Sequence, residues 1–258
     1  INKLKNYLEK IAKIKKGNLV NLNTNKIIKA IIPVHTFGHP VQIKDLLNLA
    51  TEMNLAVIED SAESIGSKYN NKHLGTFGSM GILSFNGNKT ITTGAGGAVI
   101  TDNEKLANQL RHLTTTAKEK HKWELSHDQV GYNYRMSNIS AAVGLAQIEK
   151  IDMLLIKKRA LYEKYKKSFS KNSYVDFFHE PKNSKSNFWF QSIILKKEFS
   201  DKRDIILNDL NENGLMARPC WKLMHYLNHF KKCPKMDLKQ SEDIYSRLIN
   251  IPSSSNLL

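Results

Sequence analysis

The sequence predicts an α/β protein built around a partly parallel sheet. Two short apolar runs, "KAIIPVH" (29–35) and "LAVIEDSAES" (55–64), are typical of buried strands. Between them, "VQIKDLLNLATEMN" (41–54) places apolar residues at helical spacing. A strand, a helix and a strand at this spacing form a βαβ unit, whose two strands run parallel.

Helices and strands are predicted on both sides of this unit. Residues 3–15 carry apolar side chains at helical spacing, and Gly17 should end that helix. Two further strands, "GILSFN" (81–86) and "GAVITD" (97–102), flank a glycine-rich run. The helix "NEKLANQLRHL" (103–113) follows them.

The second half of the chain changes character after a long helical pattern. Residues 114–130 are polar and irregular, and 137–169 form a helical pattern with an expected break inside it. We therefore predict a large domain over 1–155 and a small α+β domain over 156–258. In the small domain the pattern predicts a strand over 188–195 and helices over 201–214 and 241–250.

Composition excludes several classes of function. The formal charge of +15 comes almost entirely from lysines scattered along the chain, and no nucleic-acid recognition motif accompanies them. No apolar run is long enough to span a bilayer, and the basic N-terminal stretch lacks the features of a secretory signal. Two cysteines form neither a disulfide framework nor a zinc pattern. We expect a cytoplasmic protein without metal, nucleic-acid or membrane partners.

Asp60 and Glu63 come at the carboxyl end of the second buried strand. In open α/β sheets, ligands bind beyond the carboxyl ends of the strands, so these carboxylates could face a binding crevice. The same spacing also resembles a capping box at the start of a helix. The spacing alone leaves both interpretations open.

Lys89 follows the strand "GILSFN" and should lie at the same edge of the sheet as Asp60. A lysine becomes a nucleophile when burial or a neighbouring cation lowers its pKa. Ser84, five residues earlier, could offer its hydroxyl to a phosphate. The run "GAGG" (94–97) is not a phosphate-binding P-loop, because the lysine precedes the glycines. An exposed loop lysine is the alternative.

Several segments together resemble one family. They are "AIIPVHTFGHP", "VIEDSAESIGS", "LGTFGSMGILSFNGNKTITTGAGGAVITD" and "VGYNYRMSNISAAVGLAQIEKID". In this order they resemble the DegT/DnrJ/EryC1/StrS sugar aminotransferases, which have the fold type I architecture and use pyridoxal 5′-phosphate (PLP). The resemblance spans about residues 28–160 and is weaker beyond. The subgroup it looks like acts on UDP-linked 4-keto-6-deoxy amino sugars, on routes to nine-carbon acidic sugars such as legionaminic acid.

The resemblance implies a role for each matching residue. Lys89 would bind PLP covalently and move a proton between substrate and cofactor. Asp60 would pair with the pyridine nitrogen, and Ser84 would bind the phosphate. Glu63 stands where the family often has a polar residue near the cofactor oxygen. Asn133 would reach the PLP phosphate of a second subunit, which implies a homodimer with shared active sites.

Four further residues are candidates on the substrate side. His35 stands at a strand end that faces the crevice, and Arg135 follows the segment of Asn133. Trp221 and His225 fall in a segment that the family uses near the nucleotide sugar. Structural ion pairing for Arg135, and ordinary packing for His35 and Trp221, are the alternatives.

The expected reaction is transamination of a nucleotide-linked keto sugar with glutamate as the amino donor. The N-terminal residues carry neither the phosphate-binding turn nor the ring-stacking aromatic of the family. We therefore expect a chain truncated at its N-terminus that binds PLP weakly. Two alternatives stay open: a PLP-dependent sugar dehydratase, which has histidine in place of Lys89, and a non-catalytic PLP-binding or oligomerisation module.

Overall fold

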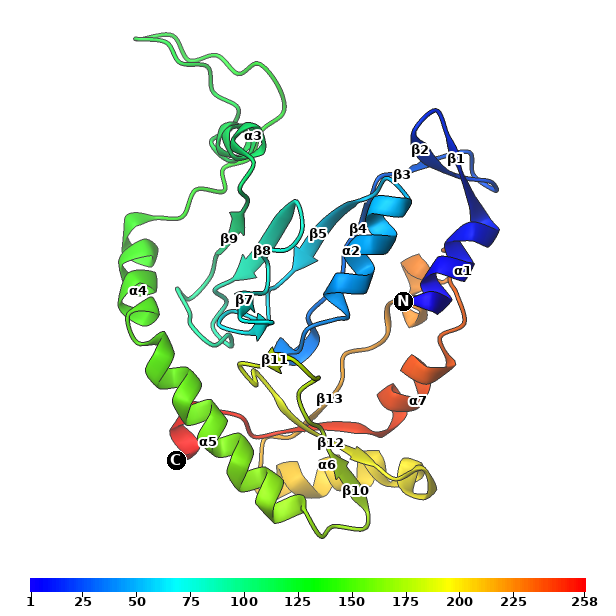
Figure 1. The fold of residues 1–258 in the computed structure, drawn as a ribbon. Helices are drawn as coiled ribbons and strands as arrows, with labels where there is room; N and C mark the ends of the chain where they lie inside the picture. Colours follow the sequence, from blue (N-terminus) through cyan, green and yellow to red (C-terminus); the bar gives the residue numbers. More distant parts are fainter.

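The computed structural model describes residues 1–258 as a mixed α/β fold with two adjoining parts (Figure 1). The first part contains a four-stranded sheet in the order β4-β5-β8-β9. Its strands are β4 (Ala30–Ile31), β5 (Ala56–Asp60), β8 (Met80–Ser84) and β9 (Gly97–Ile100). Strands β4, β5 and β8 are parallel, whereas β9 pairs antiparallel with β8. Helix α2 (Ile43–Glu52) joins β4 to β5 and confirms the predicted βαβ unit.

The N-terminal helix is shorter than the periodicity predicts. Helix α1 (Asn2–Ile11) ends where strand β1 (Ala12–Lys15) begins, so the helix predicted over 3–15 is wrong in its last turn. Strand β1 forms an antiparallel hairpin with β2 (Asn18–Asn21), which also pairs with β3 (Ile27–Ile28). The two residues between β1 and β2, Lys16 and Gly17, both have positive φ angles. Such a pair forms the tight turn that a two-residue hairpin requires, and this turn ends the helix early.

A buried carboxylate fixes the carboxyl end of β5. Glu59 is fully buried, and its Oε1 accepts hydrogen bonds from the backbone N–H groups of Phe77 (2.6 Å) and Gly78 (2.7 Å). Its Oε2 accepts from the N–H of Gly75 (2.9 Å) and from Nε2 of His35 (3.0 Å). Burial raises the pKa of Glu59, but these hydrogen bonds outweigh it and hold the pKa below its usual value. The carboxylate therefore joins the segments that follow β4 and precede β8.

Three helices connect the two parts. Helix α3 (Glu104–Thr114) is capped by the side chain of Asn103. The segment between α3 and Tyr132 projects away from the rest of the chain, which then returns toward α4 (Figure 1). On its return, the backbone N–H groups of Tyr132 and Tyr134 donate to the carbonyl oxygens of Leu113 and Thr114. Helices α4 (Asn138–Ile148) and α5 (Ile151–Phe169) follow, and the interruption between them confirms the predicted break. No helix of the chain has the length and apolar character needed to cross a membrane.

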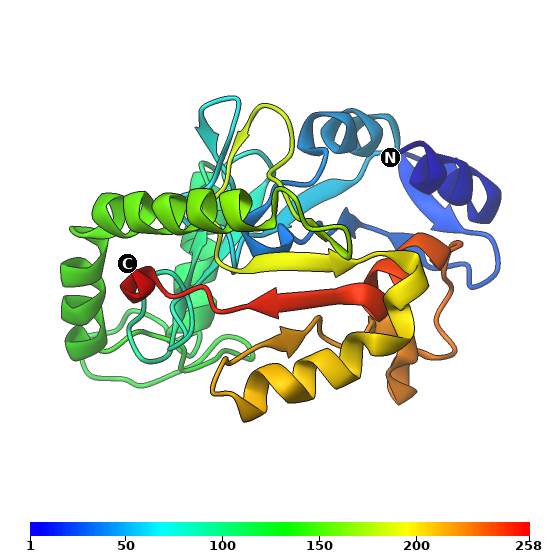
Figure 2. The same ribbon diagram turned by 90° about the horizontal axis from the view of Figure 1, so that it is seen from below.

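The second part is built on an antiparallel sheet in the order β10-β12-β14-β13. Figure 2 shows β12, β14 and β13 side by side, with α5 and α6 along the two sides of the sheet. The elements are β10 (Val175–Phe177), β12 (Gln191–Leu195), α6 (Arg203–Glu212), β13 (Arg218–Pro219), α7 (Lys239–Arg247) and β14 (Leu248–Ile251). The strand predicted over 188–195 is confirmed only over its last five residues, 191–195, since residues 188–190 precede β12, and the helix predicted over 201–214 is confirmed over 203–212.

Strand β14 corrects one prediction. The helix predicted over 241–250 ends at Arg247, and all four residues of β14 are buried between β12 and β13. Pairing on both sides of this strand stabilises an extended conformation that local periodicity cannot reveal. The two parts have separate apolar clusters, one within residues 8–57 and the other within 162–251. Helix α5 runs through the predicted domain boundary at 155/156, which stays a prediction.

The side chain of Asn187 holds the two parts together. The side-chain Nδ2 donates to the carbonyl oxygens of Glu63 and Ile65, each at 2.9 Å. The backbone N–H of Asn187 donates to Ser67 Oγ at 2.9 Å. Gly38 has a φ of +91°, and a Cβ there would lie 1.8 Å from Asn187 Oδ1. A small three-stranded sheet of β6 (Lys68–Tyr69), β7 (Lys72–His73) and β11 (Ser184–Lys185) also spans this junction. The two parts of the chain therefore meet at the segment that follows β5 in the sequence.

Replacing Glu59 with glutamine should lower the free energy of unfolding by about 3 kcal/mol, because the new NH₂ group would face N–H donors. Urea unfolding at pH 7, followed by circular dichroism, measures the change. Glu52→Gln is the matched control, because Glu52 is 52% exposed and pairs with Lys5 at the surface. The control should change the free energy by less than about 1 kcal/mol. Equal effects of the two substitutions would contradict the role of Glu59.

The contribution of the Glu59 carboxylate to stability should also depend on pH. The folded-state pKa of Glu59 lies below the ordinary value of 4.5, so its stabilisation is complete above that pH and is lost as pH falls through the folded value. Wild type should therefore lose more stability than Glu59→Gln when the pH is lowered from 7 to below 4.5. Parallel pH profiles would argue against this linkage.

Candidate functional site

The ends of β5 and β8 bring three charged side chains to one edge of the sheet. Lys89 Nζ lies 3.8 Å from Glu63 Oε1. Asp60, the last residue of β5, is close enough to both for its charge to act on their pKa values. The predicted clustering of Lys89 with Asp60 at this edge is therefore observed.

The amine of Lys89 is largely removed from solvent and makes no hydrogen bond. Its side chain is 12% exposed, and Nζ lies 3.9 Å from the centre of the Trp189 ring. Burial lowers the pKa of Lys89, while the negative charges of Glu63 and Asp60 partly oppose that shift. Lys89 is therefore not an ordinary exposed loop lysine, and a lowered pKa is a property that lysine nucleophiles require.

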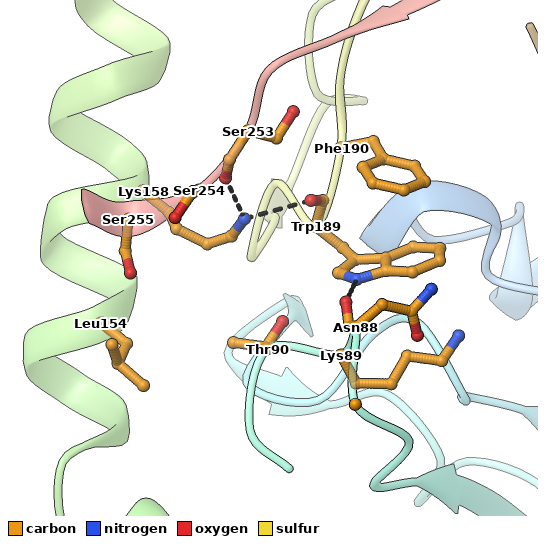
Figure 3. Close-up of a pocket in the computed structure, with 11 residues that line it drawn as sticks. Asn88, Lys89, Thr90, Leu154, Lys158, Trp189, Phe190, Ser253, Ser254 and Ser255 are labelled. Atoms are coloured by element: carbon orange, nitrogen blue, oxygen red, sulfur yellow. Dashed lines mark hydrogen bonds between the residues drawn. The ribbon is translucent and has the colours of Figure 1, made fainter. Parts of the chain in front are cut away.

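The loop that carries Lys89 is held from the second part of the chain. The Trp189 indole N–H donates to the carbonyl oxygen of Asn88 at 2.7 Å. Figure 3 shows the indole lying over the Lys89 side chain, with this hydrogen bond at its edge. Beyond the lysine, Gly94 and Gly96 have φ angles of +80° and +118°. These two glycines thus form the turn that returns the chain to β9.

Glu63 connects the amine to the segment after β4. Its Oε2 accepts a hydrogen bond from the backbone N–H of Phe37 at 2.7 Å. Burial raises the pKa of Glu63, and Asp60 adds to this effect, while Phe37 and Lys89 oppose it. No α-helix follows Asp60, and Glu63 turns toward Phe37, so the capping-box interpretation is wrong.

Two further polar side chains at this edge, Asp60 and Ser84, use only part of their hydrogen-bonding capacity within the chain. Asp60 Oδ1 accepts from the N–H of Ala62 at 3.1 Å, but Oδ2 makes no hydrogen bond. Ser84 Oγ accepts from the N–H of Asn86 at 3.4 Å, and its own hydrogen is donated to no protein group. Together with Lys89 Nζ, these groups leave a donor, an acceptor and an amine free for a ligand.

The other candidate residues lie in different surroundings. His35 is fully buried, and its Nδ1 accepts from the N–H of Val41 at 3.3 Å while Nε2 donates to Glu59. Both ring nitrogens are therefore engaged. Asn133 and Arg135 are exposed and lie between α3 and α4, where Asn133 pairs with Thr115 at the end of α3. A single chain does not test whether Asn133 reaches a second subunit, so that role stays a prediction.

The aromatic residues of the second part surround the site. Trp221 is 53% exposed and stacks on Trp189, with ring centres 5.7 Å apart. His225 pairs with Glu242 of α7 at 2.8 Å. Sequence reasoning missed Trp189, which covers Lys89 across 100 residues of chain. The only signal for it was the aromatic cluster in "FWF" (188–190) before a predicted strand.

The chain is similar in sequence to known proteins. Residues 7–258 match the DegT/DnrJ/EryC1/StrS aminotransferase family. The chain is 40% identical over 238 residues to a GDP-perosamine synthase of Escherichia coli O157:H7, covering 91% of this chain and 62% of the relative. It is 30% identical over 250 residues to a UDP-4-amino-4,6-dideoxy-N-acetyl-beta-L-altrosamine transaminase of Helicobacter pylori, covering 93% and 66%.

A solved structure extends the match to three dimensions. Helicobacter pylori PseC, an aminotransferase involved in the biosynthesis of pseudoaminic acid, superposes with a TM-score of 0.85 at 29% identity. The match covers 96% of this chain and 68% of PseC. This chain thus spans about three fifths of the length of the E. coli relative. The aminotransferases of the family use PLP and have the fold type I architecture. The chain belongs to the DegT/DnrJ/EryC1/StrS aminotransferase family.

Proposed function

We propose that this chain is a PLP-dependent aminotransferase acting on a nucleotide-linked keto-deoxy sugar, with glutamate as the amino donor. The observation that carries the proposal is the environment of Lys89, whose side chain is 12% exposed and whose Nζ makes no hydrogen bond and lies between Glu63 and the Trp189 ring. An amine withdrawn from water whose N–H groups donate to no acceptor is costly unless the site uses it.

The free groups at the sheet edge fit PLP. Lys89 Nζ would hold the cofactor covalently, and Asp60 Oδ2, which has no protein partner, would accept a hydrogen bond from the protonated pyridine nitrogen. Ser84 would donate its free hydroxyl hydrogen to the phosphate. PLP, when bound, withdraws electrons from the bond to be broken at the amino-bearing carbon.

The residues around Lys89 would then control where a proton moves. Lys89 Nζ would be the base that takes the proton from the amino-bearing carbon of the donor and delivers it to the cofactor. Its lowered pKa favours this exchange at neutral pH. Trp189 covers Nζ from the second part and excludes water from it. Glu63, fixed by the Phe37 N–H, keeps a carboxylate 3.8 Å from the amine and orients it.

The substrate is proposed to be a UDP-linked 4-keto-6-deoxy-N-acetylhexosamine. The altrosamine transaminase and PseC, which carry names from this chemistry, support that choice, whereas the GDP-perosamine synthase favours a GDP sugar. The formal charge of +15 suits either nucleotide diphosphate. Lysine at position 89, where the family's dehydratases have histidine, argues against a dehydratase.

Helix α4 supports a homodimer with shared active sites. None of its residues is buried, although several are apolar. Ile139 is 80%, Val143 45% and Leu145 60% exposed. The projecting segment exposes Trp123 and Val130 in the same way. Apolar surface of this extent marks an interface. A second copy is the proposed partner, because the role proposed for Asn133 requires a neighbouring active site.

The proposed function first predicts which lysine binds the cofactor. Wild-type chain incubated with PLP and reduced with borohydride should carry the adduct on Lys89, located by peptide mass spectrometry, and Lys89→Ala should lose it. Lys105→Ala, which changes an exposed lysine of α3, should keep it. An adduct that survives in Lys89→Ala would show that another lysine binds PLP covalently. An adduct on Lys89 without turnover of glutamate and keto sugar would favour the non-catalytic module.

The second prediction concerns Glu63. Its negative charge raises the pKa of Lys89, so Glu63→Gln should shift the pH midpoint of borohydride trapping at Lys89 to lower pH. Glutamine keeps an oxygen that can accept from the Phe37 N–H, so the loop should stay in place. Glu104→Gln, in the exposed first turn of α3, is the control. An unchanged or higher midpoint would show that the charge of Glu63 does not raise the pKa of Lys89.

The third prediction concerns the dimer. Light scattering should give twice the chain mass of 29.5 kDa for wild type, and Ile139→Asp should weaken dimerisation by about tenfold or more. Ile205→Asp, at a position 62% exposed on α6, should leave the dimer intact. A monomeric wild type would refute the proposed interface.

A further inference from the structure

A cavity of about 310 Å³ lies behind the loop that carries Lys89 (Figure 3). Its walls come from α5, from the loop at residues 87–90 and from the C-terminal segment at 253–255. In Figure 3 the Lys89 side chain runs beneath the indole of Trp189, away from Lys158. The volume lies at the lower end of the range of small-molecule sites, roughly 300–1,000 Å³. Lys89 and Trp189 also border the cavity, but the mechanism proposed above uses neither Lys158 nor the hydroxyl groups of its wall.

Lys158 places a buried positive charge in the cavity wall. The residue is 6% exposed, and its Nζ donates to the carbonyl oxygens of Ser253 (2.7 Å) and Trp189 (3.1 Å). An ammonium group has three donors, and the third has no protein acceptor here. Burial lowers the pKa of Lys158 to about 8, so the amine is still mainly charged at neutral pH.

No carboxylate compensates this charge. None of the residues that line the cavity is acidic, and Lys158 forms no ion pair. Two carbonyl dipoles stabilise the ammonium only in part, because a buried charge normally requires a counter-charge. Two other basic residues of α5 do have a counter-charge: Arg159 pairs with Glu180, and Lys166 pairs with Glu163. The charge of Lys158 is therefore left for a ligand.

Hydroxyl groups complete the lining. Ser255 Oγ makes no hydrogen bond, and Thr90 Oγ1 accepts one from Asn187 Nδ2 at 3.3 Å while donating none. Ser254 Oγ accepts from the N–H of Asn256 at 3.3 Å and also donates none. A buried ammonium beside three free O–H donors, with no acidic group, matches the hydrogen-bonding needs of an oxyanion.

We propose that this cavity binds a small molecule through a phosphate or carboxylate group, held by the Lys158 ammonium and by the hydroxyls of Thr90, Ser254 and Ser255. Such an anion would join α5, the C-terminal segment and the loop that carries Lys89. Its binding would thus restrict the motion of that loop. The proposal does not depend on the chemistry proposed for Lys89.

Calorimetric titration of the whole chain with inorganic phosphate, at constant ionic strength and pH 7, tests the proposal. Wild type should show saturable binding, and Lys158→Met should weaken it by about tenfold or more. Ser255→Ala, at a half-buried position, should weaken binding about threefold or more without affecting folding. Lys164→Met, an exposed position on the same helix, should bind as wild type does. A parallel titration with acetate tells a carboxylate site from a phosphate site.

Two results would overturn the proposal. One is the absence of saturable binding of either anion to wild type. The other is phosphate binding that Ser84→Ala weakens but Ser255→Ala does not, because this would place the anion at the cofactor edge. If Lys158→Met does not fold, Ser255→Ala and Thr90→Val decide the outcome by the same measurement, since both retain the buried lysine.

Discussion

The carboxylate of Glu59 is the interaction on which the site depends. It collects N–H groups from Gly75, Phe77 and Gly78 and the ring of His35 at one point below the sheet edge. The next residue, Asp60, has its backbone N–H and C=O bonded to Pro33 and His35. A fully buried anion with four donors tolerates little displacement. The position of the end of β5 is therefore set by buried contacts that do not involve a ligand. His35 contributes to the site by holding the Glu59 carboxylate in place.

Opposing effects then set the state of the amine. Burial disfavours the charged form of Lys89, whereas Glu63 and Asp60 favour it, and the net result is a lowered pKa. Glu63 itself has a raised pKa, because burial and the charge of Asp60 outweigh its hydrogen bond from Phe37 and the charge of Lys89. Neither group is held in a tight ion pair at 3.8 Å. A strong ion pair would have lowered the reactivity of the amine, and the wider separation preserves it.

The sequence predicted the parts of the fold that depend on local pattern. The βαβ unit, the break between α4 and α5, and the position of Lys89 near Asp60 all follow from periodicity and from the geometry of parallel strands. Two elements were mispredicted because other forces decide them. The turn at Lys16 and Gly17 ends a helix that periodicity would continue, and pairing with β12 and β13 keeps β14 extended. The cover of Lys89 by Trp189 could not be predicted, because nothing local links residues 100 positions apart.

The second part of the chain therefore takes a direct part in the chemistry of the first. Trp189 desolvates the amine, and its N–H fixes Asn88 beside it, while Asn187 binds the segment after Asp60 through the carbonyls of Glu63 and Ile65. Any change in how the two parts meet would alter both the burial of Lys89 and the position of Glu63. The pKa of the amine is thus set by the junction as much as by the sheet edge, and a residue at the junction can change reactivity without touching a substrate.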